Sequence, residues 1–202
     1  MIAIITGDII DSENHKSSVW LGILKEYLSK IGQSPLDWEI YRGDEFQLKI
    51  QKDKALETAI HLKAILKTIK GLDVRMGIGI GTETYKGSSI SESNGPAYHR
   101  SGRTLESLKE EKITLKITTG HDFIDQTLNL MLKLALNFMD DWSQVSAEIV
   151  SMTLENRDAS QTDIAQILDI QQSAVSQRQK RARLDLVFDL LDYYSHTLKE
   201  IR

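Results

Sequence analysis

The chain opens on an apolar run from Met1 to Ile10, which is typical of a central buried β-strand. One charged residue, Asp8, interrupts the run near its end. A carboxylate that is buried without a partner is costly, because it loses its hydration. We therefore expect Asp8 to lie at the exit of the strand or to contact a cation.

Strand and helix patterns alternate along the following residues. Alternation with period two predicts strands, and apolar residues along one helical stripe predict helices. The glycines within 74–80 permit close approach of another backbone to that strand. The expected order is β-α-β-β-α-β-α-β, an α+β architecture in which two helices share one face of a mixed, ferredoxin-like sheet. The predicted strands are 1–10, 38–41, 46–50, 74–80 and 113–118, and the predicted helices are 17–31, 54–69 and 96–111.

The pattern changes near residues 119–122. From Asp122 onward no strand pattern appears, and only helical stripes follow. This change predicts two domains, an α+β domain over 1–120 and an all-α domain over 121–202. The predicted helices of the second domain are 123–139, 145–154, 160–170 and a helical region from 172 to about 201 that is broken near Arg183.

The segment from Arg42 to Phe46 indicates a tight hairpin between two strands. Gly43 can adopt a backbone conformation that is closed to other residues. Asp44 beside it can present its oxygens to a hard cation, and Asp8 ends a neighbouring strand. The two carboxylates therefore form a candidate magnesium site. The alternative is an ordinary turn beside a solvated strand end.

Residues 160–182 have the pattern of a helix-turn-helix. Ile164 and Ala165 would hold the first helix against the second, in which Val175 points inward. Recognition helices of this kind dock on DNA by their N-terminal turn. The alternative is a helical bundle with a solvated basic face. The side chains predicted to contact base edges and phosphates are Gln172, Ser173, Ser176, Gln177, Arg178, Lys180 and Arg181.

Composition limits the class of protein. The chain of 202 residues has no cysteine, which excludes disulfides and thiolate sites. It shows no secretory pattern and no apolar run near the roughly 20 residues that span a bilayer, so we expect a cytoplasmic protein without membrane contact. A net charge of −4 argues against a globally basic nucleic-acid binder. Arg178, Lys180, Arg181 and Arg183 are nevertheless close together and leave a local contact with phosphates open.

Several motifs, taken together, resemble the SatD family over nearly the whole chain. They begin in the first strand and end in the basic helix near the C-terminus. The motifs are Ile4–Ile10, Tyr41–Gln47, Arg75–Gly81, Ser91–Gly95 with Arg100–Gly102, and Gln172–Arg178.

The N-terminal half is also similar to the palm domain of diguanylate cyclases and class III nucleotide cyclases. Residues 42–46 are similar to the GGDEF hairpin, with arginine in place of its first glycine. The resemblance implies that Asp8 and Asp44 hold Mg²⁺ on a nucleotide that Gly43 contacts, although the glycine that lets a guanine nucleotide lie over the hairpin is absent from this chain. Where class III cyclases have Asn and Arg one helical turn apart, this chain has His99 and Arg103. The resemblance implies that this pair contacts the nucleotide.

Arg103 has an alternative interpretation that needs no ligand. It can be a solvated helix residue that pairs with Glu106 or Ser107, and surface pairs of this kind contribute little to stability. The substitution of histidine for asparagine at position 99 is a departure from the cyclase pattern, and it weighs against cyclisation.

Two hypotheses of function follow. In the first, the protein is a DNA-binding transcriptional regulator whose palm senses a nucleotide or mediates assembly. In the second, it is a magnesium-dependent nucleotidyl cyclase or transferase, in which Arg103 would stabilise charge developing at the α-phosphate. We favour the regulator, because the chain has neither a P-loop nor a lysine-rich phosphate cradle.

A homodimer is expected as well. Helix-turn-helix proteins commonly read paired half-sites as dimers. The last helix also carries a broad apolar stripe, which exceeds what a small helical core requires. The residues of this stripe are Leu184, Val187, Leu190, Leu191, Tyr194 and Leu198.

Overall fold

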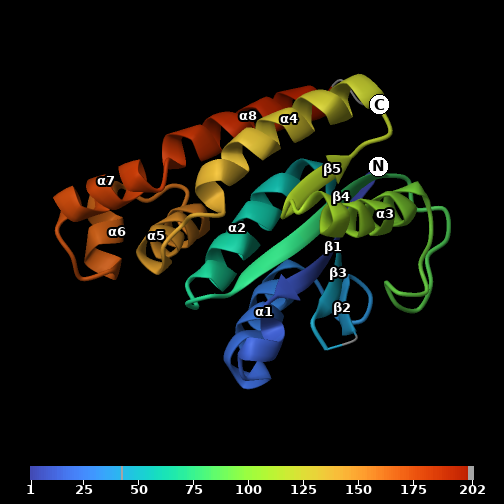
Figure 1. The fold of residues 1–202 in the computed structure, drawn as a ribbon, viewed down its shortest axis with the longest axis horizontal. Coiled ribbons are helices and arrows are strands. Elements are labelled where there is room, and N and C mark those ends of the chain that lie inside the picture. Colours follow the sequence, from blue (N-terminus) through green and yellow to red (C-terminus); the bar gives the residue numbers. More distant parts are fainter. Residues whose placement is uncertain (42, 200–202) are drawn as a thin grey trace.

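A computed structural model describes residues 1–41 and 43–199 of the chain. The strands are β1 (Ile2–Ile10), β2 (Trp38–Tyr41), β3 (Glu45–Gln51), β4 (Asp73–Gly81) and β5 (Leu115–Thr118). They form one mixed sheet of order β2-β3-β1-β4-β5 with helices on both faces (Figure 1). β1 lies in the middle and pairs antiparallel with β3 and β4, whereas β5 pairs parallel with β4.

Helices cover the sheet and extend beyond it. The helices are α1 (Ser17–Ile31), α2 (Ala55–Lys67), α3 (Pro96–Glu111), α4 (Asp122–Met139), α5 (Gln144–Glu155), α6 (Gln161–Ile167), α7 (Gln172–Arg181) and α8 (Leu184–Lys199). The order of elements as far as β5 is the order that the sequence predicted, and the α+β class is confirmed.

Side chains along β1 alternate between the two faces of the sheet, because successive residues of a strand point in opposite directions. Ala3, Ile5 and Ile9 belong to the main hydrophobic core, together with side chains of α1 and α2. Ile4 belongs instead to a smaller cluster that includes Ala97 of α3. Helices α1 and α2 therefore share one face, and α3 covers the other.

The backbone of α3 lies unusually close to β4. A Cβ atom on Gly79 would lie 2.2 Å from the carbonyl oxygen of Ala97 and 2.3 Å from the amide nitrogen of Ser101. Gly77, two residues earlier on the same face, is similarly crowded by the backbone of α3. The expectation that the glycines of this strand permit close backbone approach is confirmed.

Helix α4 protects the open edge of the sheet at β5. The side chain of Asn129 accepts a hydrogen bond from the backbone N–H of Ile117 at 2.8 Å and donates to its carbonyl at 2.7 Å. The amide thus satisfies the edge backbone as a neighbouring strand would. Among the residues described, neither α4 nor any other helix is both long and apolar enough to cross a bilayer.

Helices α5 and α8 pack on α2, and their core is continuous with that of the sheet. Ile149 and Val150 of α5 and Leu191 of α8 belong to the same buried cluster as Leu62 of α2. Tyr194 donates a hydrogen bond from α8 to the carbonyl of Lys52, which precedes α2. The boundary at 119–122 is a change of secondary structure, whereas the division into two domains stays a prediction.

Helices α7 and α8 are separate, with the break at Arg183 that the sequence predicted. Arg183 has φ of 55°, a left-handed conformation that interrupts a helix. The expected end of the last helix near residue 201 lies outside the described residues. The apolar stripe of this helix, on which the expectation of a dimer partly rested, is buried within the chain and therefore gives no support to a dimer. The buried residues are Leu184, Val187, Leu190, Leu191, Tyr194 and Leu198.

Candidate functional site

Asp8 lies near the end of β1, beside the hairpin that joins β2 to β3. The register places it opposite Glu45 on β3 and opposite Arg75 on β4. Its carboxylate accepts a hydrogen bond from Nη1 of Arg75 at 3.0 Å and lies 3.4 Å from Nζ of Lys109 on α3. Two cationic side chains of the protein therefore compensate a carboxylate that is only 14% exposed.

Asp44 occupies the turn of the same hairpin. Gly43 has φ of +90°, a conformation that side chains rarely adopt, as the sequence predicted. The backbone oxygen of Asp44 accepts a hydrogen bond from Ile9, and its carboxylate accepts one from Ser12 Oγ at 2.7 Å. Asp8 and Asp44 therefore share one end of the sheet, although their carboxylates bond to different partners. The first residue of the predicted motif, Arg42, lies outside the described residues.

The surroundings of Asp8 and Asp44 are not those of a preformed metal centre. Magnesium prefers a near-octahedral set of oxygen ligands. The oxygens of Asp8 face Arg75 and Lys109, and an oxygen of Asp44 faces Ser12. Within residues 1–41 and 43–199, no group of three or more His, Cys, Asp or Glu side chains could hold a metal ion. A cation would have to replace the ion pairs of Asp8.

His99 and Arg103 lie one turn apart on the solvent-facing side of α3, and both are exposed. The opposite side of this helix is buried on the sheet, where Thr6 donates a hydrogen bond to Ser101. Among the described residues, Arg103 forms neither an ion pair with Glu106 nor any other side-chain hydrogen bond. No contact in this part of the chain joins His99 or Arg103 to the two aspartates.

The first helix of the predicted pair, α6, begins at a capping box. Ser160 Oγ accepts a hydrogen bond from the N–H of Asp163, and the Asp163 carboxylate accepts one from the N–H of Ser160. The hydrogen bond from the hydroxyl of Ser160 also holds the pKa of Asp163 below its usual range. A box of this kind satisfies two of the free amides at the helix start. The turn that follows contains Asp169 with φ of 51°.

Helix α7 is held in place by very little of its surface. Val175 is its one fully buried residue in the described structure, as the sequence predicted. Ile164 and Ala165 of α6 are also buried, which agrees with a close crossing of the two helices. The exposed side chains of α7 are Gln172, Ser173, Ser176, Gln177, Lys180 and Arg181.

Arg178 and Gln179 face the rest of the chain instead of the solvent. Arg178, which the sequence predicted to contact DNA, donates a hydrogen bond to Glu148 of α5 at 3.0 Å and is partly buried. Gln179 donates to Thr153 of α5 and accepts from Gln161 of α6. These contacts fix the rotation of α7 about its axis, and hence which residues it exposes.

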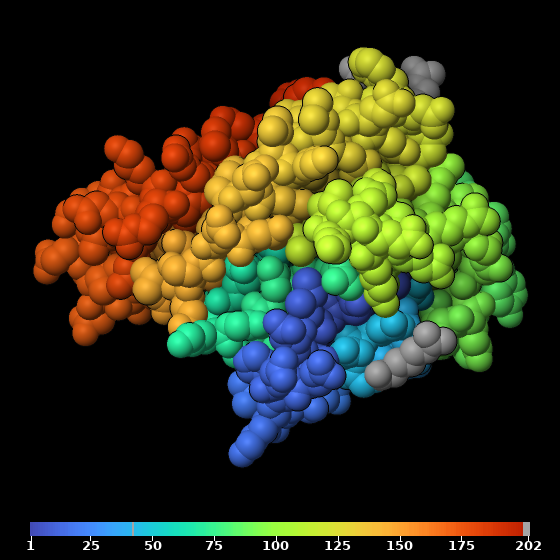
Figure 2. Space-filling model, viewed as in Figure 1, coloured from blue at the N-terminus to red at the C-terminus, as the bar shows by residue number. Residues whose placement is uncertain are grey.

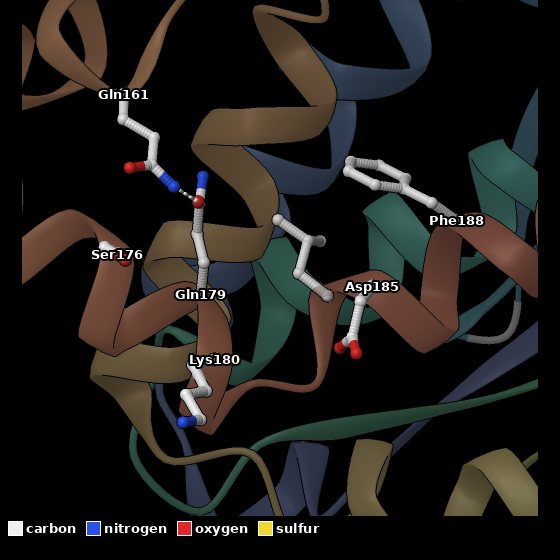
Figure 3. Close-up of a pocket in the computed structure, with 7 residues that line it drawn as sticks. Gln161, Ser176, Gln179, Lys180, Asp185 and Phe188 are labelled. Atoms are coloured by element: carbon white, nitrogen blue, oxygen red, sulfur yellow. Dashed lines mark hydrogen bonds between the residues drawn. The ribbon is translucent and has the colours of Figure 1, made fainter.

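Two surface grooves border α7. Figure 3 shows the first, of about 460 Å³, in which the side chains of Gln161 and Gln179 point toward one another on one side and Phe188 lies on the other. The second has about 450 Å³. Lys180 lines both grooves. The side chains around the second groove are Gln177, Lys180, Arg181 and Arg183.

Sequence reasoning assigned no role to the glutamines 161 and 179, and it placed Arg183 only in a general cluster of cations. Arg183 belongs to the cluster of cations that the sequence contains, so its charge was a usable signal. Gln179 had no such signal, because its partners Thr153 and Gln161 lie 26 and 18 residues away along the chain. Contacts of this kind follow from the fold and not from the local pattern.

The fold and the site define a class of α+β protein in which a mixed sheet is followed by helices that expose one polar, basic helix. The model of the SatD family matches residues 1–191, and the chain belongs to this family. A comparison with curated proteins found no match.

Proposed function

We propose that this protein is a DNA-binding transcriptional regulator in which α6 and α7 act as a helix-turn-helix and α7 enters the major groove. The observation that carries the proposal is the exposed face of α7. Its amide and hydroxyl side chains suit base edges, and Lys180 and Arg181 suit phosphates.

The position of α7 supports the proposal. It lies with α6 at one end of the elongated molecule, away from the sheet (Figure 1). A groove lined by Gln177 and the cations of Lys180, Arg181 and Arg183 runs beside it. A helix in such a position can approach a duplex without a steric conflict with the sheet. The acidic net charge of −4 makes non-specific binding elsewhere on the surface weak.

The test begins with selection from a pool of random DNA duplexes by the purified protein at low salt. Selected sequences are then measured at increasing salt. Each phosphate contact contributes a slope of about −0.9 in log K against log salt, because counterions are released. Lys180→Ala should weaken binding to all sequences alike and flatten the slope by about one. If no sequence is enriched, the proposal fails.

Variants on α7 and on α1 separate sequence recognition from non-specific attraction between the protein's charges and DNA. Gln177→Ala should change the preferred sequence and leave the salt slope unchanged, because an amide contacts base edges and carries no charge. Lys25→Ala, which removes an exposed lysine of α1, is the matched control and should leave affinity and slope unchanged. Equal losses for Lys25→Ala and Lys180→Ala would indicate attraction by overall charge alone.

We further propose that the hairpin end of the sheet binds a nucleotide together with Mg²⁺, either as a sensor or to control assembly. The support is that Asp8 and Asp44 share this end, and that Arg75 and Lys109 would be free to contact phosphates once a cation replaced them at Asp8. Mg²⁺ without a nucleotide should not bind here, because it supplies no phosphate for Arg75 and Lys109 to contact.

A thermal-shift screen tests this second part. A nucleotide that binds only the folded state stabilises it by about 2.7 kcal/mol at one hundred times its Kd. We expect a shift with Mg²⁺ and nucleotide together, none with Mg²⁺ alone, and its loss in Asp44→Ala. Glu110→Ala, an exposed carboxylate of α3, should keep the shift. Conversion of the nucleotide during the screen would favour the enzyme hypothesis instead.

A further inference from the structure

The outer side of α4 carries an apolar stripe that no part of the described chain covers. Phe123, Leu130 and Leu134 are exposed to 82%, 61% and 64%, the largest exposures of any large apolar side chains in the described residues. At 100° per residue, the three fall within about 40° of one another around the helix. Figure 2 shows α4, in yellow, uncovered along the upper edge of the molecule. A stripe of this kind marks an interaction surface.

Charges on the flank of the stripe indicate its partner. Asp122 and Lys133 are both exposed, and neither has an ion-pair partner within the described residues. They lie eleven residues apart, which is about 16 Å along the axis and about 20° around it. They therefore stand on the same flank, one near each end of the stripe. The α4 surface consists of the apolar stripe and these two flanking charges.

We propose that the α4 surface is a homodimer interface, in which α4 packs antiparallel on α4 of a second copy. A two-fold axis near residues 127 and 128 brings Asp122 of each protomer opposite Lys133 of the other. Because the two-fold axis lies in the interface plane, the charged flanks of the two protomers fall on the same side of the helix pair. The two ion pairs can therefore form together. An interface of this type is self-complementary, as two-fold symmetry requires.

The α4 surface also replaces the basis on which the sequence predicted a dimer. The stripe of α8 is buried within the chain and cannot contact a second copy. On α4 the buried side contains Leu128 and Leu132, which face the core, so the exposed stripe is additional to what the fold requires. The helix is therefore apolar on two sides, and only the inner side has its partner within the described chain.

The dimer geometry predicts the spacing of DNA half-sites. This prediction rests on the proposed function, whereas the dimer itself does not. Met139 lies about 17 Å from the two-fold axis, so the two copies of this helix end are about 35 Å apart. Helix α7 lies farther out in the same direction (Figure 1). Two recognition helices would therefore be separated by more than the roughly 34 Å of one DNA turn. Half-sites should be two or more turns apart.

The first experiment measures molecular mass by sedimentation at tens of micromolar protein. We expect a dimer for the wild-type chain and a monomer for Leu130→Glu/Leu134→Glu. Asp122→Lys and Lys133→Glu should each weaken the dimer at least tenfold in Kd, and the double reversal should restore it. Far-UV circular dichroism of each variant checks that it is folded. A monomeric wild-type protein, or a double reversal no better than either single variant, would overturn the proposal.

Disulfide trapping tests the antiparallel register independently of stability. The chain has no cysteine, so a single introduced thiol can pair only with its copy in another protomer. Thr127→Cys lies at the two-fold axis and should form a covalent dimer under mild oxidation. Asn137→Cys, exposed on the same helix but far from the axis, should not. The reverse result would exclude this register. DNA binding by a monomer would leave the proposed function intact while removing the interface.

Discussion

At the scale of single residues, His61 is a buried titratable group that lies between three helices. It lies on α2 at 9% exposure, with Nε2 3.2 Å from Ser151 Oγ of α5 and its ring in a T-shaped contact with Tyr27 of α1. Burial lowers the pKa of His61 below its ordinary value, and the nearby carboxylates of Glu155 and Glu57 only partly oppose this effect. The folded protein therefore prefers the neutral ring.

The stability contribution of His61 should be lost in acid. As the pH falls below about 6.5, the unfolded chain takes up a proton that the folded protein resists, so unfolding becomes easier. We expect the Tm of the wild-type protein to fall more between pH 7.5 and 5.5 than that of His61→Gln. Glutamine keeps a polar group near Ser151 and does not titrate. Equal decreases in Tm would contradict this account.

His15 is a control, because its contribution to stability should depend on pH in the opposite direction to that of His61. Its two ring nitrogens lie 3.1 Å and 2.9 Å from the backbone oxygens of Asp11 and Lys70, so only the protonated ring can donate to both. The hydrogen bonds to Asp11 and Lys70 raise the pKa of His15. Its contribution is present below about pH 6.5 and is lost as the pH rises. His15→Gln should therefore lower Tm more at pH 5.5 than at pH 7.5.

Sequence patterns predicted some residue environments and missed others for a physical reason. Val175 was predicted to be buried because helical periodicity alone determines which side of α7 is apolar. The partners of Asp8 could not be predicted, since Arg75 and Lys109 lie 67 and 101 residues away and reach it only through the sheet and α3. Arg178 has the positive charge that suits a contact with phosphate, so the sequence pattern indicated DNA. Its ion pair with Glu148 follows only from the fold.

At the scale of elements, the contact between β4 and α3 depends on the absence of a side chain at Gly79. Helix and strand backbones meet there, so an added methyl group has no flexible neighbour to displace. Gly102 of α3 is different, because a Cβ atom at this position would have nothing within 4 Å. The same substitution should therefore have opposite effects at two sites of one helix–strand pair.

Gly79→Ala should destabilise the protein by about 1–3 kcal/mol, the usual cost of overpacking. Gly102→Ala should stabilise it by roughly 0.5–1 kcal/mol, because alanine loses less backbone entropy in a helix than glycine does. Urea denaturation of both variants measures these changes. Destabilisation of similar size at Gly102 would indicate that helix α3 itself, and not its approach to β4, is sensitive.

Element boundaries were predicted more reliably than the roles of elements. Apolar periodicity located α1 and α3 with their observed ends. The same periodicity failed to indicate that the stripe of α8 is internal, because a helix pattern does not reveal how many neighbours cover it. Strand β5 was predicted from residue 113 but begins at Leu115, since the parallel pairing with Met76 starts there.

At the scale of the whole molecule, a buried ion cluster links the sheet to the C-terminal helices. Lys63 of α2 is fully buried, and its Nζ lies 2.7 Å from carboxylate oxygens of both Asp73 and Asp140. Asp140, just after α4, also accepts a hydrogen bond from Thr114 beside β5. A buried cation requires such partners. The cluster therefore ties α2, the sheet and the end of α4 into one unit.

A shared core and a shared ion cluster predict that the chain unfolds in one transition. Trp142 is the one tryptophan after residue 121, whereas Trp20 and Trp38 belong to the sheet region. Urea unfolding of Trp20→Phe/Trp38→Phe reports on the C-terminal helices, and that of Trp142→Phe reports on the sheet. We expect the two variants to show single transitions with similar slopes.

Asp140→Ala, introduced into each tryptophan background, makes this test decisive. It leaves the buried Lys63 with one carboxylate fewer, which should cost about 1–3 kcal/mol. If the chain is one cooperative unit, the midpoints of both probes fall by the same amount. Asp141→Ala, which removes the exposed neighbouring carboxylate, should leave both unchanged. A fall at Trp142 alone would mean that the C-terminal helices unfold separately, as two independent domains divided near residue 120 would.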